Sequence, residues 1–145
     1  MYAKLFSGDI MNELFIKQMQ ELLKDEFKDF AKALMQKQVK ALYLNKTKEN
    51  VDQLINQFEL KPHHLVKDGY YYDYEKYLLG KHPYHDAGLY YIQEPSAMIV
   101  ASLLDLKEGD KVLDMCSAPG GKAGYVASHL NQTGLVIAND INPLR

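Results

Sequence analysis

The sequence predicts an α/β fold, with an N-terminal α+β domain followed by the first β-α-β unit of a parallel sheet. Two observations predict it. Up to residue 92, a helical apolar pattern precedes short tyrosine-rich segments that are typical of strands. From residue 93, helical and strand patterns alternate, and the loop DMCSAPGGK (Asp114–Lys122) joins a strand segment to a helical one. We therefore expect two domains, residues 1–92 and residues 93–145.

The composition is that of an ordinary globular protein: 145 residues, 47% hydrophobic and 25% charged. No apolar run approaches the roughly 18 residues of a membrane span, and the first residues lack the order of a signal peptide. We expect a cytoplasmic protein without membrane contact. The formal net charge is -2, whereas a protein that holds a phosphate backbone mainly by charge should be basic. Any nucleic-acid surface must therefore be local or lie elsewhere.

The first domain begins with apolar residues at helical spacing from Ile10 to Leu34, which predicts one long helix or two short ones. We expect this stripe to be a core face; its members are Leu14, Phe15, Met19, Leu22, Leu23, Phe27, Phe30 and Leu34. Alternation from Lys40 to Thr47 predicts a strand, and a helix is expected through Val51–Phe58.

The middle of the chain, residues 68–91, holds most of the 11 tyrosines. Exposed tyrosines beside lysines could stack on bases of single-stranded RNA, but tyrosines in short strands are more often half-buried, and we favour the second interpretation. His82, His85 and Asp86 could bind zinc, although without a cysteine partner they are more typical of a turn around Pro83. We expect no metal site.

The second domain begins with a predicted helix over Gln93–Leu106, in which Pro95 suits the first helical position. Its expected apolar face consists of Ala97, Val100, Leu103 and Leu104. A strand is predicted at Lys111–Met115, a helix from Ala118 to Leu130 and a second strand at Leu135–Asp140. This order is that of a Rossmann-like unit.

The loop between the first strand and the helix favours a ligand above the strand end. Backbone N–H groups and the positive helix terminus point at this place. Gly120 and Gly121 leave room for a ligand, because a Cβ there would occupy its space. Asp140, at the end of the second strand, is placed to accept hydrogen bonds from both hydroxyls of a ribose. An adenosyl ligand fits these features.

Two phosphate-binding patterns fail at this loop. The dinucleotide pattern would put Pro119 at its first glycine, and proline cannot make that turn. The triphosphate pattern would put Cys116 at its first glycine and Ala123 at its metal-binding hydroxyl. A phosphate-free ligand, S-adenosylmethionine, is therefore favoured, with Asp114 as a contact for its ammonium group.

The segments YYIQEPSAM and VLDMCSAPGGK together resemble the Nop/Sun group of S-adenosylmethionine-dependent RNA methyltransferases. The resemblance covers nearly the whole chain and is strongest to the bacterial ribosomal RNA branch. It implies methylation of carbon 5 of cytosine in RNA, most often ribosomal RNA, and an N-terminal domain that positions the RNA. We expect a monomer with RNA as its partner.

The resemblance also implies the cofactor-binding residues. The family's loop matches Cys116, Ser117, Ala118, Pro119, Gly120, Gly121 and Lys122. Its ribose-binding acid matches Asp140. The chain departs from the family at three positions: Ser117 replaces the usual alanine, Ala123 a threonine or serine, and Tyr43 an arginine. An RNA contact by an arginine at position 43 is therefore not expected.

Enzymes of this family use two cysteines, one in a Thr-Cys motif that attacks carbon 6 of the base and one in a Pro-Cys motif that helps to release the product. This chain has only Cys116, which lies in the cofactor loop, where we expect it to line the pocket. No catalytic residue is therefore expected here. We expect the chain to be the N-terminal portion of a longer enzyme and inactive on its own.

Two other functions remain open from the sequence. One is an RNA-binding or assembly module that keeps the cofactor loop without catalysis. The other is a methyltransferase that acts on protein or on a small molecule.

Overall fold

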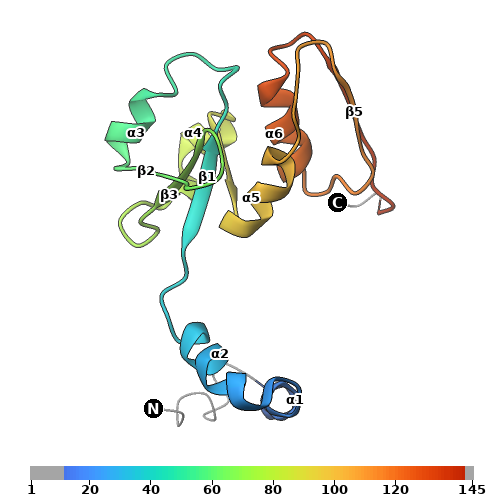
Figure 1. Ribbon diagram of the computed structural model, residues 1–145. Helices are drawn as coiled ribbons and strands as arrows, with labels where there is room; N and C mark the ends of the chain where they lie inside the picture. The colour runs from blue at the N-terminus through green and yellow to red at the C-terminus, as the bar shows by residue number, and fades with distance from the viewer. Residues whose placement is uncertain (1–11, 143–145) are drawn as a thin grey trace. The chain divides into compact units, whose positions relative to one another are not determined.

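The computed structural model describes residues 12–142, and the chain divides into two compact units between Gln38 and Val39 (Figure 1). Each unit is described by itself. The first holds helix α1 (Glu13–Leu23), a 3₁₀ turn (Lys24–Glu26) and helix α2 (Phe27–Leu34). The prediction of helix in this region is confirmed in its two-helix form; Ile10, its expected start, lies outside the described residues.

The break between the two helices lies at Lys24, whose φ of 46° is outside the helical region. Ile16 and Ala31 are buried and pack with Phe27. Four members of the stripe are exposed, so the prediction that it forms a core face is wrong at Leu14, Phe15, Leu22 and Leu34. The physical reason is that α1 and α2 are short and share a small core around Ile16, Ala31 and Phe27, which covers only part of the stripe.

The second unit contains an antiparallel sheet of order β2-β3-β1-β4, formed by Lys61–Pro62, Gly69–Tyr72, Lys40–Leu44 and Tyr90–Gln93. The predicted strand from Lys40 is confirmed as β1, an inner strand of the sheet that pairs with β3 and β4. The predicted helix after it is confirmed as α3 (Gln53–Gln57). A 3₁₀ turn (Leu79–Lys81) and a short helix α4 (Pro83–Asp86) precede β4.

Strand β1 is buried on both faces of this sheet. Leu42 and Leu44 pack on one side with Phe58 and Tyr90, and Ala41 and Tyr43 pack on the other. A strand buried on both faces is held by two cores, which explains why its sequence ALYL is apolar throughout.

The tyrosines of the middle segment are mostly half-buried in β3 and β4, as the favoured interpretation predicted. Tyr90 is fully buried, and its hydroxyl donates to the carbonyl oxygen of Leu79 at 2.8 Å. His82 caps α4, since its Nδ1 accepts from the backbone N–H of Tyr84 at 3.2 Å. Among residues 12–142, no group of three or more acidic, histidine or cysteine side chains could hold a metal ion.

Burial raises the pKa of Tyr90 to about 12, with smaller contributions from Tyr72 and Asp86. The neutral phenol is the form favoured by folding, so its contribution to stability is present below pH 10.0 and is lost as pH rises through about 12. We expect Tyr90→Phe to be less stable at neutral pH, by about 1 kcal/mol, because the Leu79 carbonyl loses its donor. We also expect its free energy of unfolding to fall less steeply between pH 10.0 and about 12.

Urea unfolding of both proteins across this pH range measures the two slopes. Some slope should remain in the variant, because burial also raises the pKa of Tyr43 and Tyr125. Identical slopes in wild type and variant would mean that Tyr90 does not titrate with folding.

The β-α-β unit predicted near the end of the chain is present. Helix α5 (Pro95–Ser102) leads to β5 (Lys111–Asp114), helix α6 (Gly121–His129) follows, and β6 (Leu135–Ala138) pairs parallel with β5. In Figure 1, α5 and α6 lie between the antiparallel sheet and β5. One core accordingly joins residues of all these elements: Ala41, Tyr43, Met98, Ala101, Tyr125 and Val126, with Val112 and Val136 packed against them. The boundary between domains at residue 92 stays a prediction.

The predicted apolar face of α5 is wrong. Met98 and Ala101 are buried, whereas Val100, Leu103 and Leu104 are exposed. The segment PSAMIVAS is apolar on nearly every side, so no polar stripe marks which side meets solvent. Proline at the first position is confirmed, with Glu94 as the N-cap.

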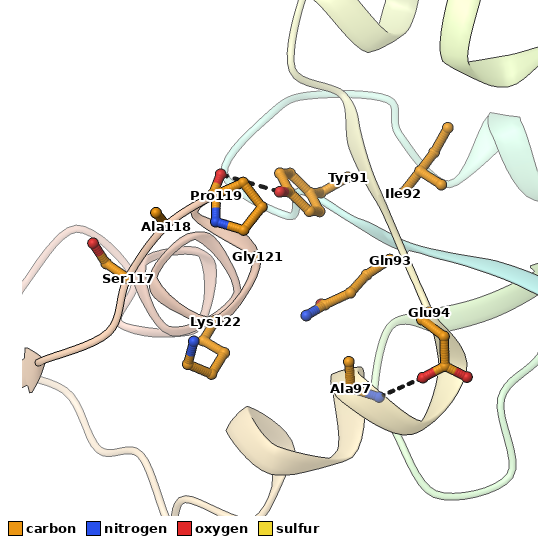
Figure 2. A pocket seen from close by; sticks show the side chains of 10 residues that line it. All are labelled: Tyr91, Ile92, Gln93, Glu94, Ala97, Ser117, Ala118, Pro119, Gly121 and Lys122. Carbon is orange, nitrogen blue, oxygen red and sulfur yellow. Dashed lines mark hydrogen bonds between the residues drawn. The ribbon is translucent and has the colours of Figure 1, made fainter. Parts of the chain in front are cut away.

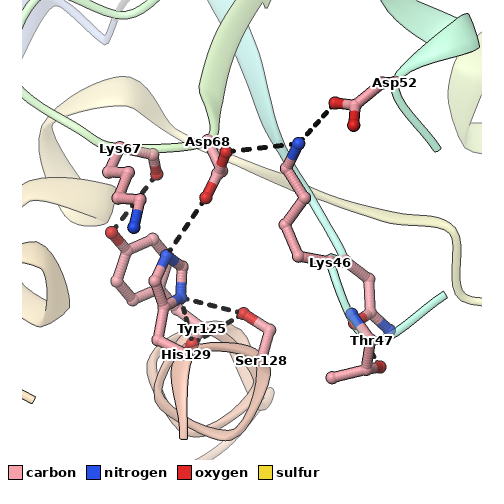
Figure 3. Close-up of polar contacts among 9 residues, drawn as sticks. Lys46, Thr47, Asp52, Lys67, Asp68, Tyr125, Ser128 and His129 are labelled. Atoms are coloured by element: carbon pink, nitrogen blue, oxygen red, sulfur yellow. Dashed lines mark hydrogen bonds and ion pairs between the residues drawn. The ribbon is translucent and has the colours of Figure 1, made fainter. Parts of the chain in front are cut away.

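Polar contacts fasten α6 to the loop that precedes β3 (Figure 3). The Nε2 of His129 lies 3.5 Å from Asp68 Oδ2, and the other carboxylate oxygen of Asp68 lies 3.5 Å from Lys46 Nζ. The hydroxyl of Tyr125 donates to the carbonyl of Lys67 at 3.3 Å. The β-α-β unit is thus held to the antiparallel sheet by polar contacts as well as by apolar packing. No helix among residues 12–142 is long and apolar enough to cross a membrane.

Candidate functional site

The loop between β5 and α6 is closed by backbone hydrogen bonds to the end of β6. Ser117 N donates to Asn139 O at 2.9 Å, and Asn139 N donates to Asp114 O at 2.8 Å. The loop contains a cis peptide between Ala118 and Pro119, and Gly120 has a φ of 104°. Only glycine adopts that φ without strain, which explains its place as the residue before α6.

Gly121 has a packing role beside the predicted one, and the room that it would leave for a ligand stays a prediction. A Cβ at this position would lie 2.8 Å from Nε2 of Gln93 and 3.1 Å from the ring of Tyr91, both on β4. The missing side chain therefore lets the start of α6 approach β4. At Gly120 a Cβ would meet nothing within 4 Å. Room for a ligand at Gly120 stays a prediction.

Lys122 fastens the loop from within α6. Its Nζ donates to the carbonyl oxygen of Cys116 at 2.8 Å and lies 3.9 Å from Asp114 Oδ2. Cys116 itself is a free, exposed thiol. The lysine thus positions the loop, and its positive charge lies beside the acid that ends β5.

Asp114 is the carboxylate at the end of β5, and its side chain is only 11% exposed. Its Oδ1 accepts from the backbone N–H of Cys116 at 3.1 Å. Its Oδ2 is buried and, among the described residues, has no hydrogen-bond partner. A buried carboxylate oxygen without a donor is costly, so this atom fits a ligand that brings an N–H or O–H group.

Asp140 lies just after β6, beside the same loop. Its Oδ2 accepts from Ala118 N at 3.0 Å, and its Oδ1 accepts from Asn142 N at 3.0 Å. A carboxylate offers about four lone-pair sites, so these bonds are compatible with further donors from a ribose. Both predicted acids, Asp114 and Asp140, therefore meet at the carboxyl ends of two neighbouring parallel strands, the place where open α/β sheets bind ligands.

A cavity of about 320 Å³ adjoins this loop (Figure 2). Ser117, Ala118, Pro119, Gly121 and Lys122 line one side. The other side is formed by β4 and the start of α5, through Tyr91, Ile92, Gln93, Glu94 and Ala97. This second side comes from the YYIQEPSAM segment, whose residues were not predicted as part of the site.

Two side chains of this second side are held in place by hydrogen bonds. The hydroxyl of Tyr91 donates to the carbonyl of Pro119 at 3.1 Å. Glu94 caps α5 through its bond from Ala97 N at 2.9 Å, and the Ser96 hydroxyl, followed by backbone amides, lowers the pKa of its carboxyl. The only signal in the sequence was the resemblance of QEPSAM to the family segment, since the contact with the loop depends on tertiary packing.

Tyr43, which occupies the position of the family's arginine, is part of the core behind the site. Its ring stacks on Tyr91 at 5.5 Å and meets the edge of Tyr125 at 5.5 Å. Burial, followed by the nearby Tyr91, raises its pKa. The side chain is therefore a buried packing element.

Comparison with known proteins gives two family matches. Residues 11–95 match the family described as the N-terminal domain of 16S rRNA methyltransferase RsmF, and residues 101–145 match 16S rRNA methyltransferase RsmB/F. A crystal structure of a methyltransferase homologue from Pyrococcus horikoshii is similar with a TM-score of 0.72 at 29% identity, over 95% of this chain and 46% of that one. The predicted α/β class is confirmed.

Two curated relatives illustrate the range of the family. The ribosomal RNA small subunit methyltransferase F of Erwinia tasmaniensis is 34% identical over 144 residues, which cover 90% of this chain and 30% of the relative. The 28S rRNA (cytosine-C(5))-methyltransferase of Mus musculus is 42% identical over 64 residues, 44% of this chain and 8% of the relative. The chain thus spans less than a third of the length of these relatives. The resemblance to the Nop/Sun group is confirmed, and the chain belongs to the family of 16S rRNA methyltransferase RsmF.

Proposed function

We propose that the protein carrying this chain is an S-adenosylmethionine-dependent methyltransferase that modifies carbon 5 of cytosine in ribosomal RNA. The observation that carries the proposal is the buried Oδ2 of Asp114, which lacks a donor beside a glycine loop at the ends of two parallel strands. The names of the relatives from Erwinia tasmaniensis and Mus musculus support the choice of ribosomal RNA and of cytosine.

The residues of this chain would bind and orient the cofactor. Asp140 would accept from the ribose hydroxyls, and Asp114 from the ammonium group of the methionine part. The backbone of Cys116, Ser117, Ala118, Pro119 and Gly120 would enclose the adenosine side, with Gly121 and Lys122 holding this backbone against β4 and β5. When bound, the cofactor supplies a methyl group on a positively charged sulfur.

The cavity beside the loop would admit the base that accepts the methyl group. It opens between the loop and β4, so a base there lies next to the bound cofactor. None of the residues of this chain is assigned to the covalent step. We expect the protein to be a monomer that works in the cytoplasm.

Methyl transfer is tested on the full-length protein with S-adenosylmethionine labelled in its methyl group and with unmodified ribosomal RNA. We expect the label at carbon 5 of cytosine, because the cofactor site and the base cavity adjoin. We also expect RNA containing 5-fluorocytosine to form a stable covalent complex, since the fluorine blocks release of the base.

Each other outcome contradicts the proposal in a distinct way. Cofactor-independent binding of RNA without any transfer would identify an assembly module. Label in protein or in a small molecule, with no complex on 5-fluorocytosine RNA, would assign a different substrate. RNA containing 5-fluorouracil in place of 5-fluorocytosine is the matched control and should not be trapped.

A further inference from the structure

A second hollow of about 370 Å³ lies between β3 and the start of α5. Tyr71, Glu94 and Ile99 line it together with the loop residues His63, His64 and Leu65. Glu94 also lines the cavity beside the cofactor loop. The two hollows therefore share a wall, and a bound chain could continue from one to the other.

The walls of this hollow are aromatic and apolar. The ring of His63 stacks on that of Tyr71 at 4.8 Å with an interplanar angle of 23°, and the ring of His64 lies 5.8 Å from that of Tyr71. Leu65, at the rim, is 70% exposed. The His64 ring is exposed and the Tyr71 ring is half-buried, whereas His63 is buried. Accessible rings and apolar groups around a hollow are suited to stacking a flat ligand, and any base offers such a flat face.

Two polar groups face the same hollow with opposite hydrogen-bonding character. His63 Nδ1 accepts from the backbone N–H groups of Leu65 and Val66, both at 3.1 Å, so its proton lies on Nε2 as a donor. The carboxylate of Glu94 is an acceptor, and its lowered pKa keeps it charged near neutral pH. A donor and an acceptor beside a stacking surface match the edge of a nucleobase, which carries both.

A lysine side chain lies next to the aromatic wall of the hollow. Lys61 on β2 pairs directly with Tyr71 on β3, so the two side chains lie on the same face of the sheet. Lys61 is exposed, and within residues 12–142 it has no ion-pair partner. In a chain of net charge -2, an unpaired lysine beside a ring stack is a local place for a phosphate.

We infer that this hollow binds one unpaired nucleotide of the RNA substrate, with the base stacked against Tyr71 and His64, its edge on His63 and Glu94, and its phosphate on Lys61. The inference rests on the proposed function, since it names a further contact for the same substrate. The shared wall at Glu94 places this nucleotide next to the one that enters the methyl-transfer cavity. Neither nucleotide can be base-paired, so the substrate is a loop or a single strand at this point.

The test uses the full-length protein and a single-stranded oligoribonucleotide of the methylated sequence, with 2-aminopurine beside the target cytosine. Stacking in the hollow should quench its fluorescence on binding. We expect His64→Ala to weaken RNA binding on the order of tenfold and to relieve the quenching, because one stacking ring is lost. Lys61→Ala should weaken binding of all sequences and reduce the slope of log affinity against log salt by about 1.

The matched controls are His85→Ala and Lys48→Ala. Each removes the same type of side chain as one of the test variants, at a position that does not line the hollow. Both should bind RNA as the wild type does. Cofactor affinity is measured separately by calorimetry in every variant and should not change. If methyl transfer and cofactor binding persist while His64→Ala and Lys61→Ala bind RNA within about twofold of the wild type, the nucleotide site is refuted and the proposed function stands. Variants that only lose thermal stability, with unchanged RNA binding, would show that these two side chains serve the fold alone and would equally refute the nucleotide site.

Discussion

Replacement of Asp114 by asparagine is expected to weaken binding of S-adenosylmethionine to the full-length protein by about 10- to 100-fold without lowering its stability. The buried Oδ2 of Asp114 has no donor among the described residues, and the proposal assigns it to the ammonium group of the cofactor. An amide of the same shape offers no negative charge to that group. The remaining oxygen can still accept from Cys116 N, so the turn at the end of β5 should survive.

The stability of the unliganded protein should change in the opposite direction. A buried carboxylate oxygen without a hydrogen bond destabilises the fold, and within residues 12–142 only Lys122, at 3.9 Å and partly exposed, offsets its charge. The neutral amide lowers that penalty, because burying an unpaired amide costs less than burying an unpaired charge, so we expect a gain in the free energy of unfolding of up to about 1 kcal/mol. Calorimetric titration with the cofactor and urea unfolding without it measure the two effects in one variant.

The matched control is Asp110→Asn at the other end of β5. Asp110 accepts from Lys107 N at 2.8 Å and is remote from the loop. It should leave cofactor affinity unchanged. Equal cofactor affinity in wild type and Asp114→Asn, with both proteins folded, would remove Asp114 from the binding site and with it the observation on which the proposed function depends.

The arrangement of Asp114 and Asp140 could be predicted from the sequence because it depends on local patterns. Each acid directly follows an apolar run that reads as a strand, and a single helix joins the two runs. A right-handed β-α-β connection puts such strands side by side and parallel, so the two carboxyl ends must meet. The structure pairs Asp114 with Ala138, two residues before Asp140.

The wall formed by β4 could not be predicted in the same way. Tyr91 reaches Pro119 across 28 residues of sequence, and neither residue carries a local sign of the other. The packing role of Gly121 could not be predicted for this reason, since the atoms that a Cβ would meet belong to Gln93 and Tyr91. The buried face of α5 was missed for a different reason: a segment that is apolar all round fits any direction of burial.

Gly124 on α6 occupies the third glycine of the dinucleotide pattern, although the chain lacks the first. A Cβ at this position would lie 2.5 Å from the hydroxyl oxygen of Tyr43, and the next nearest atom, Cζ of the same ring, would be 3.8 Å away. The Tyr43 ring is fixed between Tyr91 and Tyr125, so its hydroxyl cannot move aside. The hydroxyl oxygen of Tyr43 therefore leaves no space for a side chain at position 124, so the residue there must be glycine.

We expect Gly124→Ala to destabilise the protein by about 1–3 kcal/mol, the cost of overpacking a rigid core. In a Tyr43→Phe background the oxygen is gone, and the remaining ring atoms stand at ordinary contact distance. There the same substitution should stabilise the protein by up to about 1 kcal/mol, because alanine is the better helix former. The sign of the effect should thus reverse between the two backgrounds, as measured by urea unfolding of the four proteins in a double-mutant cycle.

Tyr91→Phe supplies the matched background, since it removes a hydroxyl from the same ring stack that points instead at Pro119. Gly124→Ala should remain destabilising there. A cost that is equal in the Tyr43→Phe and Tyr91→Phe backgrounds would mean that α6 shifts as a whole to admit the methyl group. In that case the distance between α6 and β1 would be set by the entire interface, and the Tyr43 hydroxyl would have no special part in the choice of glycine.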